Sequence, residues 1–266
     1  MKTILRFIIL AVISMLWSCE KAIDLKLKDS DVPKYVIEGS VTNQPNGCKV
    51  AISETKNFGD DNQFNGISGA SVKIENNGNT YMLTETGKGI YESTSVTGTP
   101  GQTYRLTVSI KAEVFTASST MPAVVDFLDF TLKPNDFDTT RATPRVKFKD
   151  PLDTRNRYWF QQYINDNLQM EYKVLNDEYT QGQEVNEYLV FENKTKNRAL
   201  NLKKGDRLTA EMHCIDEPVF TYLFSLFGAN GGDNGAAPTN PLSNISGGAL
   251  GFFSAHTSQR KTIVIP

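Results

Sequence analysis

The sequence contains few of the residues that most often carry catalytic or metal-binding chemistry. Its 266 residues include two histidines, His213 and His256, and three cysteines. The histidines lie 43 positions apart and form no HExxH-type pair, so a zinc site built on histidine is not expected. The sequence also lacks a Gly-x-Ser-x-Gly nucleophile elbow and a P-loop. We therefore expect no catalytic residues, metal or cofactor, and interpret His256 as a partly exposed histidine at a strand end.

No apolar run in the chain is long enough to span a bilayer. An apolar segment at residues 7–16 follows Lys2 and Arg6, and the polar stretch 18–31 ends it. A membrane-spanning helix needs about 20 apolar residues, so this segment is too short. A charged start followed by a short apolar run is typical of a cleaved secretion signal, which we assign to residues 1–18.

The signal segment ends in Leu16-Trp17-Ser18-Cys19, which resembles the bacterial lipobox, although Trp17 is bulkier than the usual residue there. We predict that the Cys19 thiol carries diacylglycerol and that its amine carries an acyl chain such as palmitate. Each buried methylene contributes about 0.8 kcal/mol, so such an anchor does not readily dissociate from the membrane. Residues 19–33 would then form a lipidated tether. The alternative is an ordinary secretion signal that contains a cysteine.

Charge is spread along the chain without a basic cluster. Removal of Lys2 and Arg6 with the signal reduces the 28 basic side chains to 26, against 30 acidic ones, for a net charge of −4. This balance disfavours nucleic-acid binding, which requires lysine and arginine opposite phosphates. Acidic pairs such as Asp177-Glu178 lack the ordered spacing of a calcium loop, and we interpret them as solvated turn formers.

Two cysteines remain after lipidation, Cys48 and Cys214. They could form a disulfide in an oxidising envelope compartment, but they lie far apart in the sequence. Two buried free thiols are our default expectation.

Residues 34–122 carry the two-residue alternation of β-strands, and we predict a β-sandwich domain there. The seven predicted strands are Tyr35–Val41, Cys48–Ser53, Ala70–Glu75, Thr80–Leu83, Ile90–Glu92, Thr103–Ile110 and Val114–Thr120. Asn76-Asn77-Gly78-Asn79 predicts a tight hairpin turn, because asparagine and glycine tolerate positive φ. The segments Gly69–Ile74, Gly89–Tyr91 and Gly101–Val108 resemble transthyretin-like, carboxypeptidase-regulatory-type sandwiches. That resemblance implies an immunoglobulin-like or transthyretin-like spacer or interaction module.

Residues 123–266 predict a second β-rich domain that contains one helix. Its predicted strands are Arg145–Pro151, Asn156–Ile164, Tyr188–Phe191 and Arg207–Cys214, after a transition segment at 126–144. A helix is expected at about 217–227, because Pro218 lies near its start and Gly228 just past its end. The glycine-rich segment Asn244–Ala255 predicts a terminal strand that approaches another backbone closely.

Aromatic residues in the predicted strand Asn156–Ile164 are candidates for ligand or partner contact. Alternation places Tyr158 and Phe160 on one face, and Trp159 and Tyr163 nearer the other. If one face is exposed, Tyr158, Trp159 and Tyr163 could stack on sugars or bind a partner. The alternative is that these rings fill the core of the second domain.

Several motifs together resemble the Bacteroidota lipoprotein family of domain of unknown function 4249. The motifs are Cys19 with its lipobox, Val36–Gly39, Thr120–Pro122, Asp150-Pro151 with Tyr158-Trp159, Gly205-Asp206, Ser243–Gly248 and Gly251–Phe253. The resemblance implies a non-enzymatic accessory lipoprotein of the outer membrane, associated with a TonB-dependent transporter in nutrient uptake. It transfers no catalytic residues. Lipid on Cys19 would hold the protein at the cell surface, and the periplasmic leaflet stays open.

Two other functions remain as alternatives. One is a stand-alone surface module that binds glycans or peptides. The other is a hydrolase, which the scarcity of histidine makes the least favoured.

Overall fold

A computed structural model describes residues 33–56, 63–134, 142–189, 192–193, 198–199, 202–229 and 240–265 of the chain. All of them fall in one compact unit. The predicted signal peptide and Cys19 lie outside the described residues. Within the described residues, no helix is long and apolar enough to cross a membrane.

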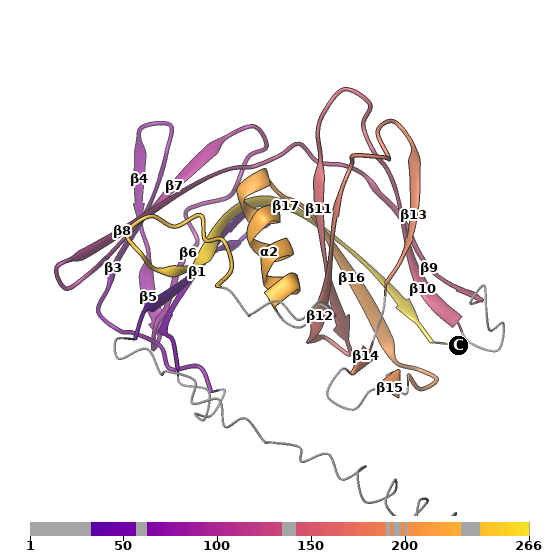
Figure 1. Cartoon of the computed structure of the whole chain (residues 1–266), viewed down its shortest axis with the longest axis horizontal. Helices are drawn as coiled ribbons and strands as arrows, with labels where there is room; N and C mark the ends of the chain where they lie inside the picture. The colour runs from indigo at the N-terminus through magenta and orange to yellow at the C-terminus, as the bar shows by residue number, and fades with distance from the viewer. Residues whose placement is uncertain are drawn as a thin grey trace, which may run out of the picture. The chain divides into compact units, whose positions relative to one another are not determined.

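The described part of the chain is mainly β-structure with one helix, as predicted (Figure 1). Its elements are β1 (Tyr35–Thr42), β2 (Cys48–Glu54), β3 (Ser71–Asn76), β4 (Asn79–Met82), β5 (Thr84–Gly87), β6 (Ile90–Ser93), β7 (Thr103–Ile110), β8 (Glu113–Thr120), β9 (Phe127–Pro134), β10 (Ala142–Lys149), β11 (Arg157–Ile164), β12 (Asn167–Asn176), β13 (Glu184–Tyr188), β14 (Glu192–Asn193), β15 (Arg198–Ala199), β16 (Arg207–Cys214), α2 (Glu217–Ala229) and β17 (Leu250–Val264).

The strands form a large sheet and three smaller ones. The large sheet has eight strands in the order β12-β11-β16-β17-β1-β2-β6-β5. The smaller sheets have the orders β4-β3-β7-β8, β13-β10-β9 and β14-β15. The β1–β17 pair is parallel, and the other pairs of the large sheet are antiparallel.

The predicted N-terminal sandwich is confirmed. Strands β1, β2 and β6 pack against the four-stranded sheet over a shared core that includes the fully buried Ile37, Val50 and Ile74. Asn77 and Gly78 link β3 to β4 with φ of 48° and 79°, the positive values that a type I′ hairpin turn requires. Strand β5 was not predicted, because all four of its residues are exposed and show no alternation.

A second core lies between the three-stranded sheet and one face of β11 and β16. It includes Phe148, Phe160 and Leu208. Strand β9 lies in the segment that we interpreted as a transition, so that interpretation was wrong. The prediction of a strand at Tyr188–Phe191 was also misplaced, because β13 ends at Tyr188; Val190 and Phe191 lie outside the described residues.

Strand β17 connects the two halves of the large sheet by pairing with β1 on one side and β16 on the other. The predicted close approach of its glycine-rich start is confirmed at Gly251, where an added Cβ would lie 2.1 Å from the carbonyl oxygen of Ile37. The boundary between the predicted domains 34–122 and 123–266 stays a prediction, and the large sheet contains strands from both sides of it.

The two remaining cysteines are buried free thiols, as expected. Burial raises the pKa of Cys48 to about 12 and also raises the pKa of Cys214. Neither thiol is therefore present as a reactive thiolate at neutral pH.

Candidate functional site

Alternate residues of β11, β16 and β17 place polar side chains on the sheet face that packs against α2. The register sets Trp159 opposite His213 and Gln161 opposite Glu211 on one side of β16, and Arg260 opposite Glu211 on the other. Because side chains alternate along a strand, these residues share one face. We call the following set the polar cluster: Trp159, Gln161, Tyr163, Glu211, His213, Ser254, His256, Ser258 and Arg260.

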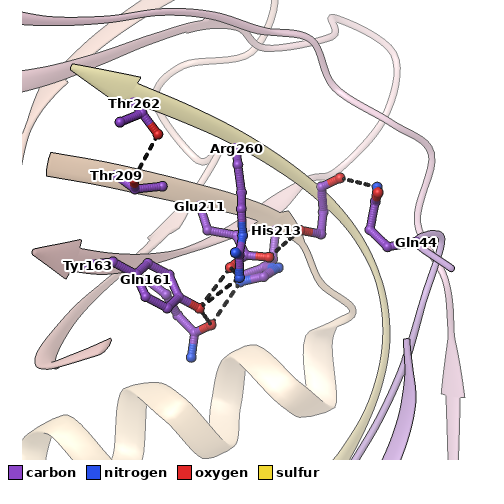
Figure 2. Close-up of polar contacts among 9 residues, drawn as sticks. Gln44, Gln161, Tyr163, Thr209, Glu211, His213, Arg260 and Thr262 are labelled. Carbon is purple, nitrogen blue, oxygen red and sulfur yellow. Dashed lines mark hydrogen bonds and ion pairs between the residues drawn. The ribbon is translucent and has the colours of Figure 1, made fainter. Parts of the chain in front are cut away.

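Glu211 is the centre of this cluster (Figure 2). Its carboxylate accepts hydrogen bonds from the Tyr163 hydroxyl at 2.8 Å and the Ser258 hydroxyl at 2.5 Å, and forms an ion pair with Arg260 at 2.6 Å. Its side chain is 9% exposed, whereas that of Arg260 is 58% exposed. Burial by itself raises the pKa of Glu211, but the three donors outweigh it and hold the pKa below its usual value. The cluster therefore keeps a buried negative charge.

Two neutral imidazoles lie beside this charge. The ring centroids of His213 and His256 are 4.6 Å apart, and the indole of Trp159 lies 4.7 Å from His213. Burial, followed by the charge of Arg260, lowers the pKa of His213 to about 3. Burial and the neighbouring His213 lower that of His256 well below its usual value. Both rings therefore stay uncharged at neutral pH.

Our interpretation of His256 as a partly exposed histidine at a strand end was wrong. The side chain is 4% exposed. The reason is that β17 does not end at Ala255 but continues to Val264, so His256 lies in the middle of the strand and opposite Thr42 of β1.

Two polar atoms of the cluster have no hydrogen-bond partner, Nε1 of Trp159 and Nδ1 of His213. These residues are 9% and 3% exposed. The other nitrogen of His213 lies 3.3 Å from the side-chain oxygen of Gln161. An unsatisfied buried polar atom costs about 1–3 kcal/mol of folding free energy. Trp159 and His213 therefore each carry a destabilising contribution.

The cluster contains a serine and a histidine in contact, but the pair is poorly suited to nucleophilic catalysis. The Ser254 hydroxyl lies 2.9 Å from Nδ1 of His256. Ser254 is fully buried, so a substrate cannot reach it in this conformation, and the lowered pKa of His256 makes it a weak base. No three histidine, cysteine, aspartate or glutamate side chains of the described residues are placed to hold a metal ion.

The three aromatic candidates from the sequence occupy different environments. Tyr158 is buried in the second core, where its hydroxyl bonds to Asp150. Trp159 lies in the polar cluster beneath α2 residues, with the ring of Phe252 at 6.2 Å. Tyr163 lies at the rim of the cluster, with the guanidinium of Arg260 4.7 Å from its ring centroid. The predicted separation of Tyr158 from Trp159 and Tyr163 by strand alternation is confirmed.

The residues that organise the cluster were not predicted. Arg207, Thr209, Glu211 and His213 alternate with apolar residues along β16, a pattern that marks a polar face. Such a pattern could have identified Glu211 from the sequence. The contact with Arg260 could not be found this way, because it depends on the register between β16 and β17.

Glu211→Gln is expected to lower the free energy of unfolding by about 1–3 kcal/mol, since charge-assisted hydrogen bonds to a buried group are lost. Urea unfolding of both proteins measures this difference. The control is Glu184→Gln, which removes an ion pair of 2.8 Å with Lys147 at an exposed site. That change should cost less than about 1 kcal/mol. Equal losses in the two variants would show that the buried network contributes no more than a surface pair.

The fold and the cluster define the chain as a β-sandwich protein with a second β-core and a buried polar network. The family profile described as Domain of unknown function (DUF4249) matches residues 20–262. The chain therefore belongs to this family, which confirms the family assignment made from its motifs. No curated protein matches the chain.

Three solved structures show remote similarity to the chain. A Bacteroides uniformis protein described as a candidate carbohydrate-binding protein is 8% identical, with 87% of this chain and 98% of that chain covered and a TM-score of 0.27. The chicken CNTN1 FN1–FN3 domains are 12% identical, with coverages of 69% and 60% and a TM-score of 0.24. A 1.5-MDa bacterial ice-binding adhesin is 12% identical, with coverages of 88% and 64% and a TM-score of 0.19. Similarities at this level do not transfer a ligand.

Proposed function

We propose that this protein is a lipid-anchored lipoprotein of the outer membrane that binds a partner and catalyses no reaction. In this proposal Cys19 carries the lipid, and residues 19–33 hold the folded part away from the bilayer. The family match starts at residue 20, directly after Cys19. This start supports Cys19 as the first residue of the mature protein.

The proposed partner is a TonB-dependent transporter of the outer membrane, which the protein would assist in nutrient uptake. The observation that carries this part is the edge strand β12. No strand of the described residues pairs with its outer side, and two of its apolar side chains, Leu168 and Met170, are 55% and 91% exposed. An exposed strand edge with apolar side chains can accept an extended segment of another protein as an additional strand.

Tyr163, at the rim of the polar cluster, lies next to the exposed apolar residues of β12. Leu168 lies opposite Tyr163 in the β11–β12 register, and the guanidinium of Arg260 covers the Tyr163 ring. We propose an extended, apolar segment of the transporter as the occupant of the β12 edge. Glu211 and Arg260, which both contact Tyr163, would hold β11 in position next to the β12 edge.

The alternative of a glycan-binding module has less support from the geometry. Trp159 is 9% exposed, so its ring is not available as a stacking platform. Tyr163 is partly covered by Arg260. An extended peptide at β12 fits the geometry better than a sugar.

Crosslinking in intact cells, followed by purification of this protein, tests the proposal. A β-barrel transporter should be recovered with the wild type. Met170→Glu should lower its recovery about tenfold, which corresponds to a loss of about 1.4 kcal/mol when a charge replaces an apolar contact. Met82→Glu is the matched control, because Met82 is 57% exposed on β4, the edge strand of a different sheet.

Recovery of the wild type alone would overturn the transporter proposal. Equal recovery with both variants would remove β12 as the docking edge. Binding of the wild type on a glycan array, without a barrel partner, would favour the alternative module.

A further inference from the structure

Two loops meet where four strands end, at one end of the second core. One loop, residues 150–156, joins β10 to β11, and the other, residues 177–183, joins β12 to β13. The backbone N–H of Asp150 donates to the carbonyl of Gln183 at 2.9 Å. Because β10 and β13 belong to the three-stranded sheet and β11 and β12 to the large sheet, these loops connect two sheets.

Each loop contributes one buried carboxylate. Asp150 is fully buried, and its Oδ1 accepts a hydrogen bond from the Tyr158 hydroxyl. Asp177 is 5% exposed, and its Oδ2 accepts the backbone N–H of Asn156. We expected Asp177 to be a solvated turn former, and this interpretation was wrong, because the loop at 150–156 covers it.

The two carboxylates are close enough to affect each other. Burial raises the pKa of Asp150, the hydrogen bond from Tyr158 opposes this, and the negative charge of Asp177 raises it further. Residues 156 and 158, which the carboxylates contact, are two positions apart in the sequence. Asp177 contacts the backbone of Asn156, directly before β11, and Asp150 contacts the hydroxyl of Tyr158 within β11.

Among the described residues, no basic side chain balances the negative charge of this pair. No lysine or arginine in the described part of the chain forms an ion pair with Asp150 or Asp177. The second oxygen of Asp150, Oδ2, is buried without a hydrogen-bond partner. A buried, unpaired carboxylate is costly unless a cation or a proton compensates it.

We propose that Asp150 and Asp177 bind a calcium ion that joins the two loops. Calcium accepts carboxylate oxygens together with water, and it tolerates irregular geometry. Asp150 Oδ2, which has no hydrogen-bond partner, and the carboxylate of Asp177 supply the charged ligands. Magnesium is a poorer fit because it demands near-ideal octahedral geometry.

The expected affinity is weak. With two carboxylate ligands, the dissociation constant should fall in the range of about 10⁻⁴–10⁻³ M that is found for extracellular calcium modules. The site would act as a crosslink between two sheets, and calcium would stabilise the folded state in proportion to its occupancy. This inference is independent of the lipid anchor and of the transporter.

The test is calorimetric titration of the full-length protein in detergent micelles with CaCl₂ after removal of metals with EDTA. The wild type should bind one ion. At a calcium concentration of about ten times the dissociation constant, its Tm should rise by about 3–6 °C. MgCl₂ at the same concentration should have a much smaller effect and controls for ionic strength.

Asp177→Asn should weaken calcium binding at least about tenfold, because a charged ligand is lost. Asp153→Asn is the matched control, since Asp153 is an exposed acid in the same loop as Asp150. It should leave binding unchanged. Terbium luminescence sensitised by Tyr158, displaced by calcium, provides a second readout in the wild type.

Two results would overturn the proposal. One is a wild type that shows neither binding heat nor a Tm shift in CaCl₂, in which case the pair is neutralised by a proton. The other is equal loss of binding in Asp153→Asn and Asp177→Asn. If Asp150→Asn fails to fold, the wild-type titration and the Asp177→Asn variant still decide the question.

Discussion

Gly251→Ala is expected to lower the free energy of unfolding by more than about 4 kcal/mol, enough to leave much of the protein unfolded. An added Cβ would lie 2.1 Å from the carbonyl oxygen of Ile37, and the φ of Gly251 is +95°. Because Ile37 is its partner in the parallel β1–β17 pair, the clash can be relieved only by moving two backbones apart. Urea unfolding followed by circular dichroism measures the loss.

Gly248→Ala is the control for this prediction. Gly248 has a similar φ of +90°, but nothing lies within 4 Å of an added Cβ. Its substitution should cost only the backbone strain of about 1–3 kcal/mol. Equal losses at Gly248 and Gly251 would show that the close approach of β17 to β1 contributes nothing beyond local strain.

Lowering the pH from 7 to 5 is expected to remove about 4 kcal/mol of stability through His213 and His256 together. Their pKa values lie far below the unfolded value of 6.5, and that of His213 is about 3. The unfolded chain therefore binds more protons in this range. The stabilisation is present above about pH 6.5 and is lost as the pH falls toward the folded pKa values. Urea unfolding at pH 7, 6 and 5 measures the slope.

The double variant His213→Gln, His256→Gln isolates this effect. Carboxyl groups whose pKa is raised by burial, namely Glu38, Asp150 and Asp216, act in the opposite direction on acidification. These carboxyl groups are present in both proteins. The difference between the two proteins in the pH dependence of the free energy of unfolding is therefore due to the histidines. A wild type and a variant with the same pH dependence would contradict the assignment of two neutral, buried imidazoles.

Regular alternation made the first sandwich predictable. Strands such as β1, β2 and β7 bury one face and leave the other partly exposed, and this burial is visible as an apolar residue at every second position. Strand β12 escaped prediction because its residues are mostly half-buried and it lies at a sheet edge. The start of the helix was predictable because Pro218 lies in its first turn. Its predicted end was wrong, because α2 continues through Gly228 to Ala229.

Contacts between strands that are far apart in the sequence could not be predicted from it. The glycine-rich pattern predicted that Gly251 approaches a backbone, but not that Ile37 provides it. In the same way, His213 and His256 meet because β16 and β17 are neighbours in the sheet, and no local pattern contains that information. The candidate site was therefore predicted in part, through Trp159 and Tyr163, while its central charge was not.

The centre of the polar cluster is buried, whereas the edge strand β12 is partly exposed to solvent. Both carboxylate oxygens of Glu211 have partners within the chain, and His213 and His256 are shielded from solvent. The edge strand β12 presents Met170 and Leu168 to the outside. On the proposed function, binding takes place at this edge, and the polar cluster keeps the underlying strands in register.

Mass spectrometry of the mature protein tests most directly whether Cys19 anchors the protein in a membrane. We expect an N-terminus at Cys19, with a diacylglycerol thioether on its sulfur and an acyl chain on its amine. An unmodified Cys19, or an N-terminus at another residue, would contradict it.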